Sequence, residues 1–362
     1  MRVALITDIP SWYSETNYLN ELEKKMKETG IISKVFVVGA SKTFKKIDTS
    51  TGIIRFINTI KLLKSLSDYD MFHIHFTYLA SGFLFLRSLG LLNKPIIIHT
   101  HGYDVFTVPS INYGFRTKLI GQIFTNYAWK RADRIIAVCN KAKLEIEKAG
   151  IKSEKIDLLY NGINEKLFLK NLTEVPKDLS EIRENSDLIF LSVASIFPVK
   201  NHVRMLNAFE KLAKKYSSKL KIKLVLIGPQ GSSPFKFENP DVIYIGKKNH
   251  SELSKFYSFA DAFVLPSLSE ANSWAILEAM SCELPVIVSD VGGNPDVVED
   301  SRFRFNPLDI QDILDKFALI VEMSPEERKI IGTANRQKIL NGFTIEDHTR
   351  KLKQIYETFV SS

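Results

Sequence analysis

The sequence predicts an α/β protein built from two doubly wound, Rossmann-like domains. Its 362 residues exceed one ordinary hydrophobic core and suit two domains. Short runs rich in Val, Ile and Leu alternate with helical stretches, and this alternation begins again after a polar segment near the middle of the chain. Because strands that alternate with helices form parallel sheets, we expect one such sheet in each half.

The first half contains six strand-like runs separated by helical stretches. A helical stretch from Tyr18 ends at Gly30, a residue suited to a helix C-terminus. The apolar stretch from Phe76 is interrupted by Arg87, falls short of the roughly 20 apolar residues that a membrane span needs, and is expected to form a buried helix. The strand-like runs lie at 2–9, 34–40, 71–76, 95–102, 134–139 and 155–162.

The polar segment 171–187 contains Pro176 and lacks strong periodicity, so we expect a linker there. It would join an N-terminal domain at 1–170 to a C-terminal domain at 188–344. The last stretch, 345–362, places apolar residues on one helical face and predicts a helix that closes back toward the N-terminal domain. Strands of the second domain are expected at 188–196, 222–228, 242–246, 262–267 and 285–293.

Positive charge is concentrated in the first half of the chain. Residues 1–170 contain 25 Lys and Arg against 15 Asp and Glu, whereas residues 171–362 contain 24 against 26. Such asymmetry indicates an anionic partner, namely an anionic membrane face, a phosphate-bearing acceptor or nucleic acid. A lysine-rich, solvated surface is the alternative interpretation.

The two cysteines and the first residues of the sequence indicate the cellular compartment. Cys139 and Cys282 each lie inside an apolar run, so we expect them to be reduced and buried. The chain enters a strand pattern directly, with no cleavable hydrophobic segment before it. We therefore expect a cytoplasmic protein.

The stretch SEANSWAILEAM contains two glutamates, Glu270 and Glu278, around an expected helix start. Asn272 or Ser273 is a suitable N-cap for a helix that begins near Trp274. Ligands of open α/β sheets bind outside the carboxyl ends of the strands, where helix N-termini attract phosphate. Eight helical positions span at most about 12 Å, on the order of the distance between the sugar and the ribose of a nucleotide diphosphate sugar.

Residues 264–298, which contain this stretch, resemble the donor-site signature of retaining glycosyltransferases of the GT-B fold, family four (glycosyl transferase group 1). Further matches follow in the family's order at 96–104, 156–168, 193–212 and 224–231. The resemblance implies two Rossmann-like domains that face a central cleft, an N-terminal, acceptor-side domain at 1–170 and a C-terminal, nucleotide-sugar-binding domain at 188–344. It also implies a hexosyltransferase that moves sugar from a UDP- or GDP-sugar to a glycan or lipid-linked acceptor, in the cytoplasm or at the inner face of the membrane. No obligatory metal and no nucleic acid partner are expected.

The resemblance also implies the site residues. Glu270 would meet the donor sugar near the reacting carbon, Lys200 would stabilise charge on the leaving diphosphate, and Glu278 would accept the ribose hydroxyls. His101 would face the donor sugar from the first domain. The expected catalytic residues are His101, Lys200 and Glu270, and the expected donor-binding residues are Gly228, Asn272, Ser273, Trp274 and Glu278.

Two departures from the family pattern affect these expectations. Ser195 stands where the family usually has an Arg, so Arg204 or Lys247 would supply the second positive charge, or the diphosphate is held more weakly. The family's Gly-Gly near the first helix is replaced by Ser14-Glu15-Thr16-Asn17, and Glu15 would repel a diphosphate. This loop is therefore expected to meet the acceptor.

Other motifs in the sequence allow alternative interpretations of its sites and of its function. Asp68-Tyr69-Asp70 has a D-x-D form used for metal-bound diphosphates, but it directly precedes a strand and is expected to be a turn. The histidines at 73, 75, 99 and 101 suggest a metal cluster, but a parallel strand buries both faces, and we expect ordinary buried residues. The rival functions are a non-catalytic protein that binds sugar nucleotides or glycans, and a sugar-nucleotide epimerase of the same fold. An assay of donor hydrolysis or transfer separates the non-catalytic rival from a transferase.

Overall fold

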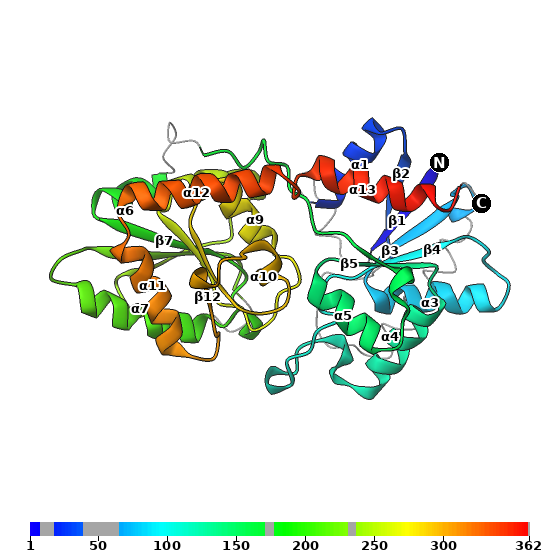
Figure 1. Ribbon diagram of the computed structural model, residues 1–362, viewed down its shortest axis with the longest axis horizontal. Helices are drawn as coiled ribbons and strands as arrows, with labels where there is room; N and C mark the ends of the chain where they lie inside the picture. The colour runs from blue at the N-terminus through cyan, green and yellow to red at the C-terminus, as the bar shows by residue number, and fades with distance from the viewer. Residues whose placement is uncertain (8–17, 39–64, 171–176, 231–236, 361–362) are drawn as a thin grey trace. The chain divides into compact units, whose positions relative to one another are not determined.

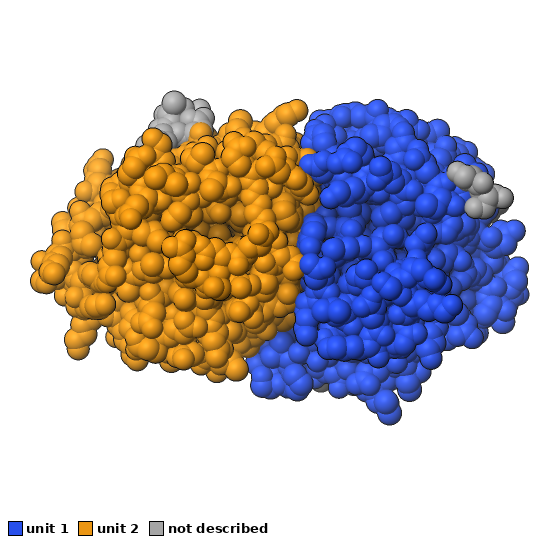
Figure 2. All heavy atoms as spheres, in the orientation of Figure 1, with its two compact units in different colours: residues 1–160, 345–362 blue, residues 161–344 orange. Residues whose placement is uncertain are grey.

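The computed structural model describes residues 1–7, 18–38, 65–170, 177–230 and 237–360. The chain forms two compact units, coloured separately in Figure 2. Unit 1 contains Met1–Tyr160 and Ile345–Ser362, and unit 2 contains Asn161–Thr344. Each unit is built on its own parallel six-stranded sheet with helices packed against it (Figure 1). The predicted class of two Rossmann-like domains is confirmed.

In unit 1 the strand order is β2-β1-β3-β4-β5-β6. All five residues of β3 are buried, as expected for a strand inside a parallel sheet that helices cover. The strands are β1 (Arg2–Thr7), β2 (Ile32–Val37), β3 (Met71–His75), β4 (Ile96–His99), β5 (Arg134–Ala137) and β6 (Ile156–Leu158). The helices are α1 (Tyr18–Glu28), α3 (Thr77–Ser88), α4 (Leu119–Arg131), α5 (Asn140–Lys148) and α13 (Ile345–Glu357).

In unit 2 the strand order is β12-β11-β10-β7-β8-β9, so the order reverses between β7 and β10. Loops on either side of such a reversal diverge and leave room for a ligand at the carboxyl ends of the strands. The strands are β7 (Leu188–Val193), β8 (Ile222–Ile227), β9 (Val242–Gly246), β10 (Ala262–Leu265), β11 (Val286–Ser289) and β12 (Arg304–Phe305). The helices are α6 (Lys177–Glu184), α7 (His202–Tyr216), α8 (Leu253–Phe259), α9 (Trp274–Ser281), α10 (Asn294–Val297), α11 (Ile310–Glu322) and α12 (Pro325–Leu340).

The last helix belongs to unit 1 although it follows unit 2 in sequence. Ile345, Leu352 and Tyr356 are buried in the same core cluster as residues of β1 and α1. This is the apolar face that the sequence pattern indicates.

The structure describes residues 177–187 of the expected linker. These residues lie in unit 2, and the chain passes from unit 1 to unit 2 after Tyr160. Within this segment, α6 buries Leu179, and Arg183 binds Asp261 at 2.7 Å beside the start of β10. One buried apolar residue and one ion pair hold this short helix, and neither produces a clear periodic pattern in a polar sequence.

Cys139 and Cys282 are both buried and free, as predicted. Among the residues that the structure describes, no helix is long and apolar enough to cross a membrane.

Candidate functional site

The reversal of strand order in unit 2 brings Lys200 and Glu270 together. Lys200 ends the short 3-10 helix η5 (Pro198–Lys200) after β7, and Glu270 follows β10. The Lys200 ammonium donates a hydrogen bond to Glu270 Oε1, and Ser267 Oγ donates to the same oxygen at 2.6 Å. The Glu270 side chain is mostly buried, while that of Lys200 is about a quarter exposed. The pair therefore combines a positioned carboxylate with an ammonium that solvent reaches.

Hydrogen bonds between the two loops fix the position of this pair. Asn201 adopts a left-handed conformation (φ 54°), and its side-chain amide donates to the carbonyls of Pro266 at 3.1 Å and Pro307 at 2.7 Å. The backbone N–H of Leu268 donates to the Val199 carbonyl at 2.7 Å. Because Asn tolerates this backbone conformation better than most residues, the turn places Lys200 at low conformational cost.

Gly292 supports Glu270 from the loop after β11. Its φ is +55°, and a Cβ atom there would lie 1.7 Å from the Glu270 carbonyl oxygen. The next residue, Gly293, donates its N–H to that carbonyl at 3.2 Å. Only glycine fits such a close approach, which explains the glycine at position 292.

The expected helix start after Glu270 is present as α9. Ser273 is the N-cap residue, without a side-chain capping bond, and Trp274 is the first helical residue. Asn272 is buried, and its side-chain oxygen and its carbonyl accept hydrogen bonds from Asn161, each at 2.8 Å. The Asn272 side chain therefore holds the loop. The first N–H groups of α9 have no acceptor within the helix, as at any helix start.

Glu278 lies inside α9 and is buried at 4% exposure. His250 Nε2 donates to its Oε1 at 2.9 Å, since a carboxylate only accepts, and the Tyr257 hydroxyl donates to its Oε2 at 2.8 Å. Burial and the adjacent Glu278 charge raise the pKa of Tyr257, which keeps its hydroxyl protonated as a donor. Each carboxylate oxygen has two lone pairs, so both retain the capacity to accept one further hydroxyl.

Gly228 follows β8 and lies against the loop after β7. A Cβ atom at this position (φ +150°) would lie 2.0 Å from the Ala194 carbonyl oxygen. Of the two alternative cations, Arg204 donates to Asn201 Oδ1 at 2.9 Å and lies beside the Lys200 turn. Lys247 follows β9, which lies beyond β8 at the edge of the sheet.

In unit 1, His101 follows β4 in a loop held by Asp104. The backbone N–H of His101 donates to Asp104 Oδ1 at 3.0 Å. Asp104 Oδ2 accepts from the Thr77 N–H at 2.9 Å and from the Thr77 hydroxyl at 2.8 Å. Asp104 is fully buried and was not among the predicted site residues.

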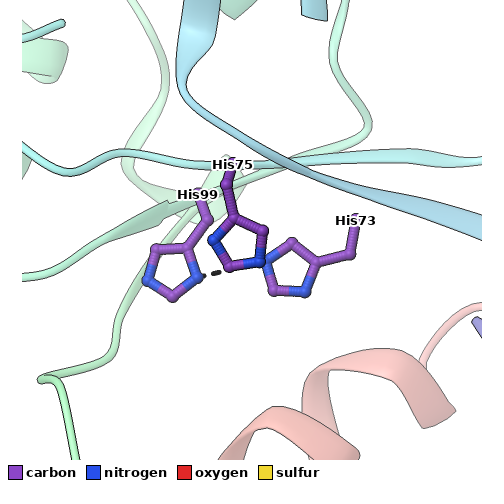
Figure 3. A group of neighbouring side chains, drawn as sticks. All are labelled: His73, His75 and His99. Carbon is purple, nitrogen blue, oxygen red and sulfur yellow. Dashed lines mark hydrogen bonds between the residues drawn. The ribbon is translucent and has the colours of Figure 1, made fainter. Parts of the chain in front are cut away.

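His101 belongs to a cluster of five imidazoles in unit 1, which we call the histidine cluster. Two pairs of nearly parallel rings form hydrogen bonds, His73 Nε2 with His99 Nδ1 at 3.1 Å and His75 Nδ1 with His101 Nε2 at 2.9 Å. The two pairs also stack on each other, His73 on His75 and His99 on His101. Figure 3 shows His73, His75 and His99 side by side. The fifth member, His348 of α13, stacks on His99.

Burial keeps the histidine cluster neutral. It lowers the pKa of His75 to about 3 and that of His348 to about 4, and holds the pKa of His73, His99 and His101 well below the ordinary value. Nitrogen atoms of His73, His75 and His99 lie within 4.8 Å of one another, and imidazole nitrogens are common metal ligands. In this arrangement the facing nitrogens of His73 and His99 bind each other.

The structure brings together some predicted residues and adds others. Ser267, His250 and Tyr257 were missed, although His250 and Tyr257 are seven residues apart, a spacing that puts both on one helical face. Asp70 of the D-x-D sequence accepts from the Arg2 N–H at 2.7 Å in the turn before β3. Ser14-Glu15-Thr16-Asn17 lies outside the described residues.

Comparisons with known proteins identify the family of the chain. The family model for glycosyl transferases group 1 matches residues 176–338, and that for glycosyltransferase family 4 matches residues 22–167. The UDP-Gal:alpha-D-GlcNAc-diphosphoundecaprenol alpha-1,3-galactosyltransferase of Escherichia coli is 26% identical over 312 residues, which cover 83% of this chain and 78% of that protein.

Solved structures share the fold over the full length of the chain. Sucrose-phosphate synthase from Thermosynechococcus elongatus superposes with a TM-score of 0.79 at 18% identity, covering 100% of both chains. The HepE protein of Anabaena, in complex with UDP, superposes with a TM-score of 0.73 at 16% identity, also covering 100% of both chains. With the two family models matched in succession, the chain belongs to the group 1 glycosyltransferases, whose two Rossmann-like domains form the GT-B fold.

Proposed function

We propose that the protein is a retaining hexosyltransferase that moves sugar from a UDP- or GDP-sugar to a glycan or lipid-linked acceptor. The observation that carries this proposal is the Lys200–Glu270 pair at the reversal of strand order in unit 2. A ligand that binds there meets an ammonium, a carboxylate and the first N–H groups of α9. These are the groups that a sugar diphosphate needs.

The three groups have different tasks in the proposed reaction. The Lys200 ammonium and the N-terminus of α9 stabilise the negative charge that grows on the diphosphate as the glycosidic bond breaks. Glu270 accepts hydroxyls of the transferred sugar near its reacting carbon. Glu278 accepts the ribose hydroxyls, oriented by His250 and Tyr257.

We propose that no metal is obligatory, because Lys200 supplies a positive charge at the leaving group. Arg204 is a better candidate than Lys247 for the second positive charge, which the family's usual Arg would supply. Its side chain forms a hydrogen bond with Asn201, the residue after Lys200. His101 would contact the donor sugar from unit 1, with its loop held by Asp104.

Of the two donor nucleotides, we propose UDP before GDP. The Escherichia coli relative has a UDP-sugar and a diphosphoundecaprenol acceptor in its name, and the HepE structure contains UDP. These facts support a UDP-sugar donor and a lipid-linked acceptor here, and the positive excess of residues 1–170 supports a phosphate-bearing acceptor.

A thermal-shift panel of UDP- and GDP-sugars tests the proposed donor site. A ligand that binds only the native state raises the melting temperature. The proposal expects one nucleotide series to stabilise the wild type and to stabilise Glu278→Gln less. Lys211→Ala, on the exposed side of α7, is the control that should match the wild type. A panel in which no nucleotide sugar raises the melting temperature contradicts the proposal.

A further inference from the structure

Helix α4 of unit 1 begins with a run of large apolar side chains that face solvent. Leu119 is 71% exposed, Ile120 61%, Ile123 58% and Phe124 46%. These four residues, which we call the α4 ridge, occupy positions i, i+1, i+4 and i+5 and therefore share one helical face. The opposite face is buried against the unit. Soluble proteins rarely leave such a contiguous apolar patch exposed without a binding role.

The positive charge at the start of α4 does not stabilise the helix. The N-cap position of α4 holds Lys118, which is exposed and makes no capping bond, and the first turn contains no acidic residue. A helix N-terminus is stabilised by capping acceptors and negative charge, so a lysine followed by apolar residues is unfavourable there. The same residues are favourable at the boundary between lipid headgroups and acyl chains.

Packing holds the ridge at the edge of the sheet where His101 lies. The Ser81 hydroxyl of α3 donates to the Phe124 carbonyl at 3.3 Å, and Arg87 at the end of α3 binds the Arg131 carbonyl at the end of α4. The two helices therefore run side by side in the same direction (Figure 1). Since α3 starts directly after β3, α4 also starts at the carboxyl edge of the sheet.

The sequence around the α4 ridge has a positive excess. Between residues 76 and 132 the only acidic residue is Asp104, which is fully buried. Lys118 lies directly before the ridge, and the same stretch contains five more basic residues, of which Lys130 and Arg131 lie in the last turn of α4 and Arg87 pairs with Asp133, namely Arg87, Lys94, Arg116, Lys130 and Arg131. A second copy of the chain would bring two such surfaces together, and like charges oppose that contact. An anionic bilayer complements both the charge and the apolar ridge.

We propose that the α4 ridge is a membrane-docking surface, which lies in the interface of an anionic bilayer with Lys118 at the level of the lipid phosphates. The ridge is too short to cross the bilayer and would be held by its apolar side chains together with charge. Membrane binding by the ridge does not depend on the proposed function. The role that we give to this binding does rest on it, because docking would bring the edge that carries His101 toward a lipid-linked acceptor.

Co-sedimentation of the full chain with vesicles tests the docking surface. Vesicles of phosphatidylcholine alone are compared with vesicles that also contain phosphatidylglycerol, at low and high salt. The test variant is the double substitution Ile120→Gln/Ile123→Gln. The matched control is Ile330→Gln, on α12 of unit 2, whose side chain is exposed to the same 61% as Ile120. Thermal shift with the donor nucleotide confirms that each variant is folded and keeps its donor site.

The expected result is that the wild type and Ile330→Gln bind the anionic vesicles, and that the double variant loses binding by roughly tenfold or more. Lys118→Gln should weaken binding at low salt more than at high salt, because the attraction is screened. Equal binding by the double variant and the wild type would overturn the proposal. A wild type that stays in solution with anionic vesicles would also overturn it. So would a wild type that forms a dimer, if the double substitution converts that dimer to monomers. A donor nucleotide that fails to bind would instead count against the proposed function.

Discussion

At the scale of single residues, the Lys200–Glu270 contact keeps an ammonium and a carboxylate paired with each other in the candidate site. Each of the two side chains neutralises the other, so neither charge is left unpaired in a partly buried loop. In the proposed reaction, a diphosphate would compete for the Lys200 ammonium and release the Glu270 carboxylate toward the sugar. The ion pair would then contribute both to the stability of the site and to the electrostatics of the proposed reaction.

Lys200→Ala is expected to lower kcat by about 10²- to 10³-fold while weakening donor binding by less, because the charge on the leaving group grows toward the transition state. Steady-state kinetics together with a direct titration of the donor separate the two effects. Lys211→Ala on α7 should leave both values unchanged. A loss of affinity as large as the loss of kcat would mean that Lys200 only binds the ground state.

Glu278→Gln is expected to weaken binding of the free nucleoside diphosphate by roughly 1.5–3 kcal/mol, because a neutral amide replaces a charged acceptor. Gln is preferable to Ala here, since His250 and Tyr257 would both lose their acceptor in Glu278→Ala. Isothermal titration with UDP and GDP measures the effect. An unchanged affinity would remove Glu278 from the ribose site.

At the scale of elements, the loop after β4 depends on one buried carboxylate. Asp104→Asn would turn an NH₂ group toward either the His101 N–H or the two donors of Thr77, leaving at least one buried donor without an acceptor. We expect the free energy of unfolding to fall by about 1–3 kcal/mol. Urea unfolding measures this loss, with the exposed Asp68→Asn as control. Equal stability of the two variants would contradict the role given to Asp104.

The histidine cluster predicts a decline in stability at mildly acid pH. The folded pKa values lie below the unfolded value of about 6.5, so the unfolded chain binds protons that the native state does not. Stability is therefore full above pH 6.5 and falls as the pH drops below it, down to about pH 4 for His348 and about pH 3 for His75.

Unfolding free energies measured from about pH 7.5 to about pH 5.5, on both sides of the ordinary histidine pKa, test this prediction. His348→Gln keeps a donor for the Tyr160 carbonyl and an acceptor for the Tyr18 hydroxyl, the two bonds that His348 makes. Its slope against pH should be shallower than that of the wild type by the contribution of one group. Identical slopes would show that His348 is not neutral in the native state.

The sequence predicts elements well where their pattern is local and fails where stability comes from tertiary contacts. The buried strands are runs of branched apolar residues, and the entry into α9 was identified from Ser273 and Trp274. β12 contains only Arg304 and Phe305 and is too short to produce a pattern. The partners of Glu270 and Glu278 were missed because Ser267, His250 and Tyr257 are brought there by the fold.

At the scale of the whole molecule, the chain contains two sheets, each in its own unit, and the proposed function assigns a role to both units. Unit 2 contains the ammonium, the carboxylates and the helix start that fit a nucleotide sugar. Unit 1 contains His101, the histidine cluster and the α4 ridge, together with most of the positive excess. The division predicts that substitutions of Lys200, Glu270 or Glu278 in unit 2 change donor affinity, whereas substitutions on the α4 ridge change membrane binding alone.

The most direct test of the central claim is a transfer assay with the donor that the thermal-shift panel selects, run in the presence of a chelator. The account predicts that the wild type transfers the sugar to a lipid-linked diphosphate acceptor, that nuclear magnetic resonance finds the product with the anomeric configuration of the donor, and that Lys200→Ala is nearly inactive. Donor binding without any transfer or hydrolysis would instead indicate a non-catalytic sugar-nucleotide-binding protein. An inverted product, or activity that only added metal restores, would contradict the mechanism.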